Sequence, residues 1–238
     1  MTDISKQQKE FTSESGLKTY RKMVVGDASF FKFIDFELST FLLGNLGGII
    51  GFGLRSLAYP ILFKQCGKRP AFGKSMVLRG VNKIEIGNKV LFDDFSVLDA
   101  RGKNASIYIG DFVSLGRNSG LISKNGNIKI AKGVNIGTFC RIATENSIEI
   151  GESSLVAAYS YIGPSNHRQD DRTGSFISQE MENKGGVKIG KNVWIGAHTT
   201  IMDGVSIGDN SIVGAHSFVN KDVPPNSLAL GVPAQFIK

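Results

Sequence analysis

The chain has 238 residues, of which 41% are hydrophobic and 21% charged, and its formal net charge is +7. This length and apolar share suffice for a packed core, so a wholly disordered chain is excluded. Gly is frequent, at 29 residues, but only 6 Pro accompany it without a G-X-Y period, which excludes collagen. The positive balance favours anionic partners, such as a phosphorylated cofactor, a nucleic acid or an anionic membrane surface.

Residues 1–75 are predicted to form a partly helical N-terminal region. Residues 1–22 are polar and mixed in charge, without the apolar segment of a secretory signal. The stretch Phe41–Phe63 has the length of a membrane span, but it contains Arg55, Pro60 and five glycines. A packed helical segment that covers the main domain is favoured, an interfacial membrane anchor is the second alternative, and a transmembrane helix is the third.

Aromatic and basic residues are concentrated between residues 21 and 69. The aromatic set is Phe30, Phe31, Phe33, Phe36, Phe41 and Phe52, and the basic set is Arg21, Lys22, Lys32, Arg55, Lys64, Lys68 and Arg69. Interfacial segments use this composition, because it joins apolar burial to attraction for anionic lipid. We therefore predict a cytoplasmic protein with peripheral, salt-sensitive contact to the inner face of the cytoplasmic membrane through residues 30–69.

From residue 76 onward, the sequence repeats with a period of six. Aliphatic residues recur without a break at Ile189, Ile195, Ile201, Ile207, Val213 and Val219, and a small or β-branched residue follows four positions later. Blocks of three continue the pattern upstream at Ile150, Val156 and Ile162, at Ile130, Ile136 and Ile142, at Ile109, Leu115 and Leu121, and at Ile86, Phe92 and Leu98. A helix cannot produce this period, whereas short strands joined by tight turns can.

Three hexapeptides make one triangular coil, because the frame breaks after Leu98, Leu121, Ile142 and Ile162, each time after three repeats. The insertions are therefore expected to leave from one corner of successive coils. The pattern predicts an all-β solenoid of about six coils over residues 76–223, with a long loop at 163–188 and a tail at 224–238. Cys140 takes a small inward position, so it needs no role as a nucleophile.

Two stretches resemble a known family. The run VKIGKNVWIGAHTTIMDGVSIGDNSIVGAHSFVNKDVPPNSLALGVPAQFIK at 187–238 looks like the end of the maltose, galactoside and xenobiotic acetyltransferase branch of the hexapeptide-repeat acyltransferases. The resemblance implies a left-handed parallel β-helix and a homotrimer. Residues 1–75 are similar, less specifically, to the N-terminal regions of acetyltransferases from bacterial surface-polysaccharide clusters.

The second stretch, YIGPSNHRQD at 161–170, resembles the place where that branch carries its catalytic histidine, and this makes His167 the expected general base. His198 and His216 occupy equivalent corner positions and are expected to be solvated. An unperturbed histidine has a pKa near ~6.5, which suits a base at neutral pH. The three histidines are separated by 31 and 18 residues, so the close pair of a γ-class carbonic anhydrase is missing and no metal is expected.

The resemblance also implies acetyl-CoA as the acyl donor, bound in a groove near the C-terminal coils. The residues expected to line this groove are Trp194, Gly196, Ala197, Gly214, Ala215, Asn220, Lys221 and Lys238. The backbone amides of Ala197 and Ala215 would meet the pantetheine arm, and the lysines would meet the phosphates. The chain departs from the family at Asn220, where Thr is common, and at Gln235, where a basic residue is common.

These observations favour an acetyl-CoA-dependent O-acetyltransferase that acts on a sugar or on a surface-polysaccharide precursor. The alternatives are an N-acetyltransferase for an amino-sugar nucleotide and a non-catalytic assembly subunit. A homotrimer is predicted to pair outer faces that carry Trp194 and Phe139, and no nucleic-acid motif is present. The acceptor stays open, as does the group that orients His167, for which Asp170, Asp171, Glu180 and Glu182 are candidates.

Overall fold

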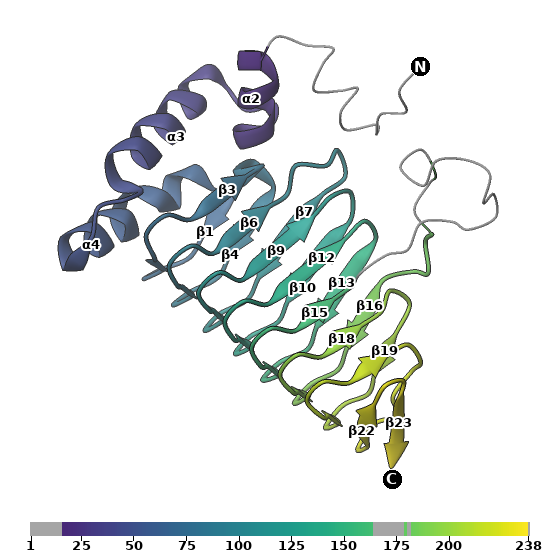
Figure 1. The fold of residues 1–238 in the computed structure, drawn as a ribbon. Coiled ribbons are helices and arrows are strands. Elements are labelled where there is room, and N and C mark those ends of the chain that lie inside the picture. The colour runs from purple at the N-terminus through teal and green to yellow at the C-terminus, as the bar shows by residue number, and fades with distance from the viewer. Residues whose placement is uncertain (1–15, 164–178, 180–181, 238) are drawn as a thin grey trace.

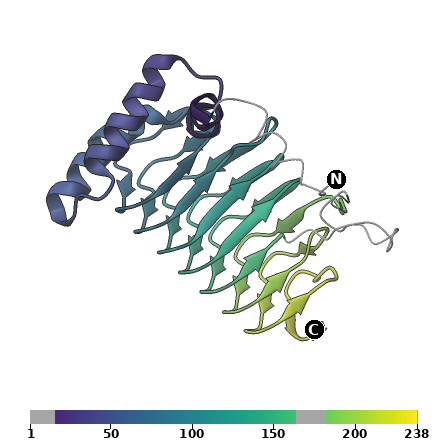
Figure 2. The ribbon, with the colours of Figure 1, turned by 45° about the horizontal axis from the view of Figure 1, so that its top comes forward.

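The computed structural model describes residues 16–163, 179 and 182–237, and its body is a triangular prism of three parallel sheets (Figures 1 and 2). Sheet A contains β1 (Gln65–Cys66), β4 (Ile84–Ile86), β7 (Ser106–Ile109), β10 (Asn127–Ile130), β13 (Ser147–Ile150), β16 (Val187–Ile189) and β19 (Ser206–Ile207). Sheet B contains β2 (Ala71–Phe72), β5 (Leu91–Phe92), β8 (Ser114–Leu115), β11 (Asn135–Ile136), β14 (Leu155–Val156), β17 (Trp194–Ile195), β20 (Ile212–Val213), β22 (Leu228–Gly231) and β23 (Ala234–Ile237). Sheet C contains β3 (Val77–Arg79), β6 (Val97–Asp99), β9 (Gly120–Ser123), β12 (Arg141–Thr144), β15 (Tyr161–Ile162), β18 (Thr200–Ile201) and β21 (Phe218–Val219).

One strand from each sheet makes a coil, and the predicted left-handed parallel β-helix is confirmed with seven coils instead of about six. The additional coil consists of β1, β2 and β3, of which β1 and β2 lie inside the range 1–75 that was assigned to the N-terminal region. Cys66, Phe72 and Leu78 continue the six-residue frame and pair with the strands of the second coil. The sequence count missed this coil because Cys66 replaces the aliphatic residue of its first hexapeptide.

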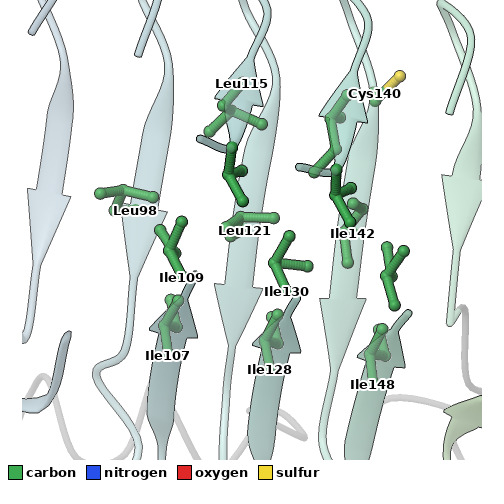
Figure 3. Close-up of a cluster of buried hydrophobic side chains, with 14 of the residues drawn as sticks. Leu98, Ile107, Ile109, Leu115, Leu121, Ile128, Ile130, Cys140, Ile142 and Ile148 are labelled. Carbon is green, nitrogen blue, oxygen red and sulfur yellow. The ribbon is translucent and has the colours of Figure 1, made fainter. Parts of the chain in front are cut away.

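The core is a column of inward aliphatic side chains that stack from coil to coil (Figure 3). Ile109, Ile130 and Ile150 are in register across sheet A, and all are fully buried. The small inward residues four positions further bind neighbouring coils: Ser119 Oγ donates to Gly137 O at 2.6 Å, and Ser154 Oγ donates to Gly190 O at 2.9 Å. Their hydroxyl groups thus satisfy corner carbonyls that the strands leave unpaired.

The corners follow one rule in every coil. At the corners that follow sheets A and B, the third residue after the inward side chain has a left-handed backbone, with φ between 53° and 60° at Lys89, Phe95, Phe139, His198 and His216, for example. The residues that break the frame, 100–105, 124–126, 145–146 and 163–186, all lie between sheet C and sheet A. The expectation that insertions leave from one corner therefore holds.

Three helices, α2 (Gly16–Val25), α3 (Phe30–Leu43) and α4 (Gly48–Ala58), cover the first coil (Figure 1). The 3-10 turn η1 (Tyr59–Leu62) follows α4, and η2 (Val81–Lys83) contacts α2. Phe72 stacks between Phe63 and Phe92, at centroid distances of 5.7 and 5.4 Å, and continues the core into this cap. Ser29 begins α3 as its N-cap, accepting a hydrogen bond from the Lys32 amide.

Arg55 fixes the helices to the solenoid. Only 3% of this residue is exposed, and its guanidinium donates to Phe72 O, Leu43 O and Leu46 O at 3.0, 2.9 and 2.6 Å. Arg55 therefore satisfies carbonyl groups inside the cap, and its expected place among the surface charges around the apolar segment is wrong. Helix α4 packs against β2 of the first coil, while much of the apolar surface of 41–63 stays exposed. None of the helices within the described residues is long and apolar enough to cross a membrane.

The opposite end of the prism is closed by a hairpin. β22 pairs in parallel with β20, and β23 turns back to pair antiparallel with β22, so that Leu228 faces Ile237. The two ends are thus finished differently, by helices at the first coil and by this hairpin after the seventh coil (Figure 1).

Candidate active site

The predicted base and one predicted cofactor ligand, His167 and Lys238, lie outside the described residues. The two ends of the loop that contains His167 are described: Gly163 follows β15, and Gly186 precedes β16. Both ends lie at the corner between sheets C and A, in coils five and six.

Four of the predicted cofactor residues gather at another corner, between sheets B and C of coils six and seven. Gly196 and Ala197 follow β17, and Gly214 and Ala215 occupy the same place one coil further along the axis. Their backbones stack directly, because the His216 amide donates to Ala197 O at 2.8 Å. The fold therefore brings these four residues together at one corner.

The backbone amides of Ala158, Ala197 and Ala215 form a row along this corner, and none of the three donates to an acceptor within the part of the chain that the structure describes. We call this row the amide corner. At the corner between sheets A and B, the equivalent amides of Lys68 and Lys191 donate to Asn88 Oδ1 and Asp209 Oδ1, each at 2.8 Å. Unsatisfied N–H groups in a row are donors for a ligand.

Trp194 lies on β17 immediately before the amide corner, with 52% of its surface exposed. Its neighbours in register on sheet B are Leu155 and Ile212, whose side chains are also exposed. Gly196 has a structural reason of its own, because a Cβ atom there would lie 2.4 Å from the Ala215 nitrogen. Trp194 and Ala215 are exposed and Ala197 is partly exposed, so a ligand can contact all three.

A column of stacked rings runs along the same corner. Phe139, Tyr159, His198 and His216 come from four successive coils, with centroid distances of 5.0, 4.7 and 4.7 Å and interplanar angles of 1°, 5° and 5°. Phe139 thus lies at a corner, and its predicted place on a flat outer face is wrong. The sequence showed the equivalence of the two histidines, but the extension to Phe139 and Tyr159 was missed, although all four stand three residues after an inward aliphatic.

Asn220 and Lys221 are not part of the amide corner. They follow β21, at the far end of sheet C from Ala215, and Lys221 lines a small pocket with Gln235 and Phe236 of β23. A ligand that contacts both Ala215 and Lys221 must therefore extend along β21. A long phosphorylated thiol has this shape, and the lysine offers its anionic end a partner.

Asp203 joins the end of the His167 loop to the solenoid, and sequence reasoning missed it. Only 6% of Asp203 is exposed. Its Oδ2 accepts from the Lys184 amide at 2.9 Å and from Asn146 Nδ2 at 3.3 Å, and its Oδ1 accepts from the Gly186 amide at 2.9 Å. A single buried carboxylate therefore fixes the segment from Lys184 to Gly186 against coils four and six.

The two cysteines are free, and neither is suited to act as a nucleophile. Burial raises the pKa of the Cys66 thiol to about 11. Burial also raises the pKa of Cys140, against the opposing hydrogen bonds of Ser160, Ser119 and Tyr159. Both are therefore thiols at neutral pH. Among the described residues, no three His, Cys, Asp or Glu side chains lie close enough to hold a metal ion.

The comparisons with known proteins agree with this architecture. Residues 186–221 match the model "Bacterial transferase hexapeptide (six repeats)". Galactoside O-acetyltransferase of Escherichia coli is 34% identical over 57% of this chain and 68% of its own length. The chain belongs to the hexapeptide-repeat transferase family, which confirms the family resemblance found in the sequence.

For two other relatives, the match covers a smaller share of the relative's length than it does for the galactoside O-acetyltransferase. A probable acetyltransferase of Mycobacterium tuberculosis is 34% identical over 56% of this chain, and the putative lipopolysaccharide biosynthesis O-acetyl transferase WbbJ of E. coli is 33% identical over 48%. The chain spans 44% and 61% of these two proteins, respectively.

Solved structures share the fold. The D94N mutant of the N-acyltransferase AntD from Bacillus cereus, in complex with dTDP and coenzyme A, has a TM-score of 0.52 at 23% identity and covers 74% of this chain and 84% of its own. The polysialic acid O-acetyltransferase OatWY has a TM-score of 0.51 at 23% identity, covering 73% and 80%. At this identity the likeness describes the fold alone.

Proposed function

We propose that the protein is an acetyl-CoA-dependent O-acetyltransferase that acts on a hydroxyl of a sugar or surface-polysaccharide precursor. The amide corner carries this proposal, because unpaired amides beside the exposed Trp194 suit an extended ligand with amide carbonyls. The names of the relatives, which include a galactoside O-acetyltransferase and a putative lipopolysaccharide O-acetyl transferase, support the acceptor class.

In this proposal, the amides of Ala197 and Ala215 donate hydrogen bonds to the carbonyls of the pantetheine arm, and Lys221 neutralises phosphate charge. Acetyl-CoA supplies the activated acetyl group as a thioester. His167 takes the proton from the acceptor hydroxyl as its oxygen attacks, which is the role of a general base. As the new C–O bond forms, the C–S bond of the thioester breaks, and the departing sulfur of coenzyme A takes up the proton that His167 removed.

The test is acetyl transfer from labelled acetyl-CoA by the purified full chain to three acceptor classes: neutral sugars and oligosaccharides, lipid-linked oligosaccharides, and amino-sugar nucleotides. We expect alkali-labile O-acetyl product with one of the first two classes. Product on the amino-sugar nucleotide alone would replace the proposal with N-acetylation. Absence of product, together with absence of acetyl-CoA binding by calorimetry, would favour the non-catalytic assembly subunit.

We also predict a homotrimer with its active sites between subunits. The ends of the His167 loop and the amide corner lie on two different edges of the prism in one chain. Closing three prisms about an axis places one edge of each subunit next to another edge of its neighbour, which joins the two halves of the site. Light scattering at micromolar concentration should give three times the 25.7 kDa mass of the chain. A monomeric mass would contradict this arrangement.

A further inference from the structure

The helical cap has an apolar face that its packing leaves uncovered. On α3, the side chains of Phe33 and Phe36 are buried, while a second stripe at helical spacing is exposed: Phe30, Phe31, Ile34, Leu38, Phe41 and Leu42. Phe31 and Phe41 are 80% and 83% exposed. An amphipathic helix of a globular protein needs only the first face, so packing on the solenoid does not explain the second.

The adjoining helix extends this surface. On α4, Ile49, Ile50, Phe52, Leu54 and Leu57 are exposed. The single charged residue of α4, Arg55, is directed inward to the carbonyls of the cap. The exposed surface of α4 therefore carries no charge. We call the exposed apolar side chains of α3 and α4 the cap face; α3 and α4 lie at the end of the prism remote from the closing hairpin (Figures 1 and 2).

The excess positive charge of the protein lies at the same end. Residues 16–92, which comprise the helices, the first coil and strands β4 and β5 of the second coil, contain twelve Lys and Arg against four Asp and Glu, a net charge of +8. The whole chain carries +7, so the remainder is almost balanced. Lys22, Lys32, Lys68 and Arg69 are exposed and form no ion pair with a carboxylate of the described residues.

We propose that the cap face binds the surface of an anionic lipid bilayer, with α3 and α4 lying in the interfacial region. Such binding requires large apolar side chains beside unpaired cations. The apolar side chains are buried among the lipid acyl chains, and the cations are attracted to the anionic headgroups. A second copy of this chain fits less well, since pairing two cap faces would bring together two regions of +8. At 14 and 11 residues, α3 and α4 suit a position along the surface.

The test is sedimentation of the full chain with vesicles of phosphatidylcholine alone and with vesicles of phosphatidylcholine and phosphatidylglycerol in equal parts. We expect the protein to sediment with the anionic vesicles at low salt and its partition coefficient to fall roughly tenfold at high salt, because added ions screen the headgroup attraction. Vesicles without anionic lipid should bind at least about tenfold less.

Two variants separate the apolar and the charged contributions. The F31S/F41S pair removes exposed side chains, so the fold should persist by circular dichroism while vesicle binding falls at least tenfold. The K22Q/K32Q/K68Q triple should lose the salt dependence. The matched control is F95S/F112S, which changes two exposed phenylalanines at corners of coils two and three and should bind as the unmodified protein does.

Three results would overturn the proposal. The first is folded protein that stays in the supernatant with every vesicle. The second is unchanged vesicle binding by F31S/F41S. The third is an assembly larger than a trimer that F31S/F41S dissolves, because a second copy of the chain would then cover the cap face.

Discussion

Replacing His167 with alanine should lower kcat by roughly 10²- to 10⁴-fold, the usual contribution of a general base. The binding of acetyl-CoA should remain nearly unchanged, because the amide corner lies at a different edge of the prism from the two ends of the loop that contains His167. Turnover and calorimetric binding of the same preparations measure the two effects separately. In the unmodified enzyme, kcat/KM should rise with pH as the base loses its proton, and this limb should vanish in the variant.

The controls for this experiment are His198→Ala and His216→Ala. Each removes one ring from the column at the amide corner, where His198 stacks on Tyr159 and His216 at 4.7 Å. We expect the KM for acetyl-CoA to change by a few-fold, because the column borders the amide corner where the cofactor is proposed to bind. If His198→Ala lost turnover while His167→Ala kept full turnover, the general base would be His198 and not His167.

The second large effect is expected from Asp203→Ala. This change removes both acceptors of the Lys184 and Gly186 amides, so the end of the His167 loop loses its buried attachment. A displacement of about 1 Å in a catalytic group can cost roughly 10²-fold in rate, and we expect a loss of that order in kcat. Stability should fall by about 1–3 kcal/mol, the penalty for buried donors left unpaired.

Asp209→Ala is the matched control. Its carboxylate caps the Lys191 amide at 2.8 Å with the same chemistry, but at the corner between sheets A and B, away from the loop. Asp209 is exposed and accepts this hydrogen bond near the surface, so the variant should lose less stability than Asp203→Ala, with little change in kcat. Steady-state kinetics and thermal unfolding of both variants decide the matter: an equal loss of kcat in the two variants would mean that Asp203 acts only through stability.

The solenoid could be predicted from the sequence because its pattern of inward residues repeats every six residues. Each hexapeptide carries its own inward aliphatic, its small partner and its corner, so Ile130 or Ser154 can be assigned without knowing any other part of the chain. The sequence analysis missed the first coil, because Cys66 occupies the inward position where the other hexapeptides of sheet A have an aliphatic residue. Ala197 and Ala215 were placed together because equivalent positions of successive coils must stack.

The tertiary structure decided the features that depend on neighbours distant in sequence. From the sequence, Arg55 was interpreted as a surface cation, but in the structure it donates hydrogen bonds to the carbonyls of Leu43, Leu46 and Phe72. Nothing in the sequence indicated the role of Asp203, because the amides that it binds, of Lys184 and Gly186, lie nineteen and seventeen residues earlier in the chain. The sequence by itself determined the coil, because the inward positions of the coil repeat every six residues. The hydrogen bonds of Arg55 and Asp203 join residues that are far apart in the chain, so no period predicts them. Which apolar side chains of α3 stay exposed is likewise decided by how the helix packs on the solenoid.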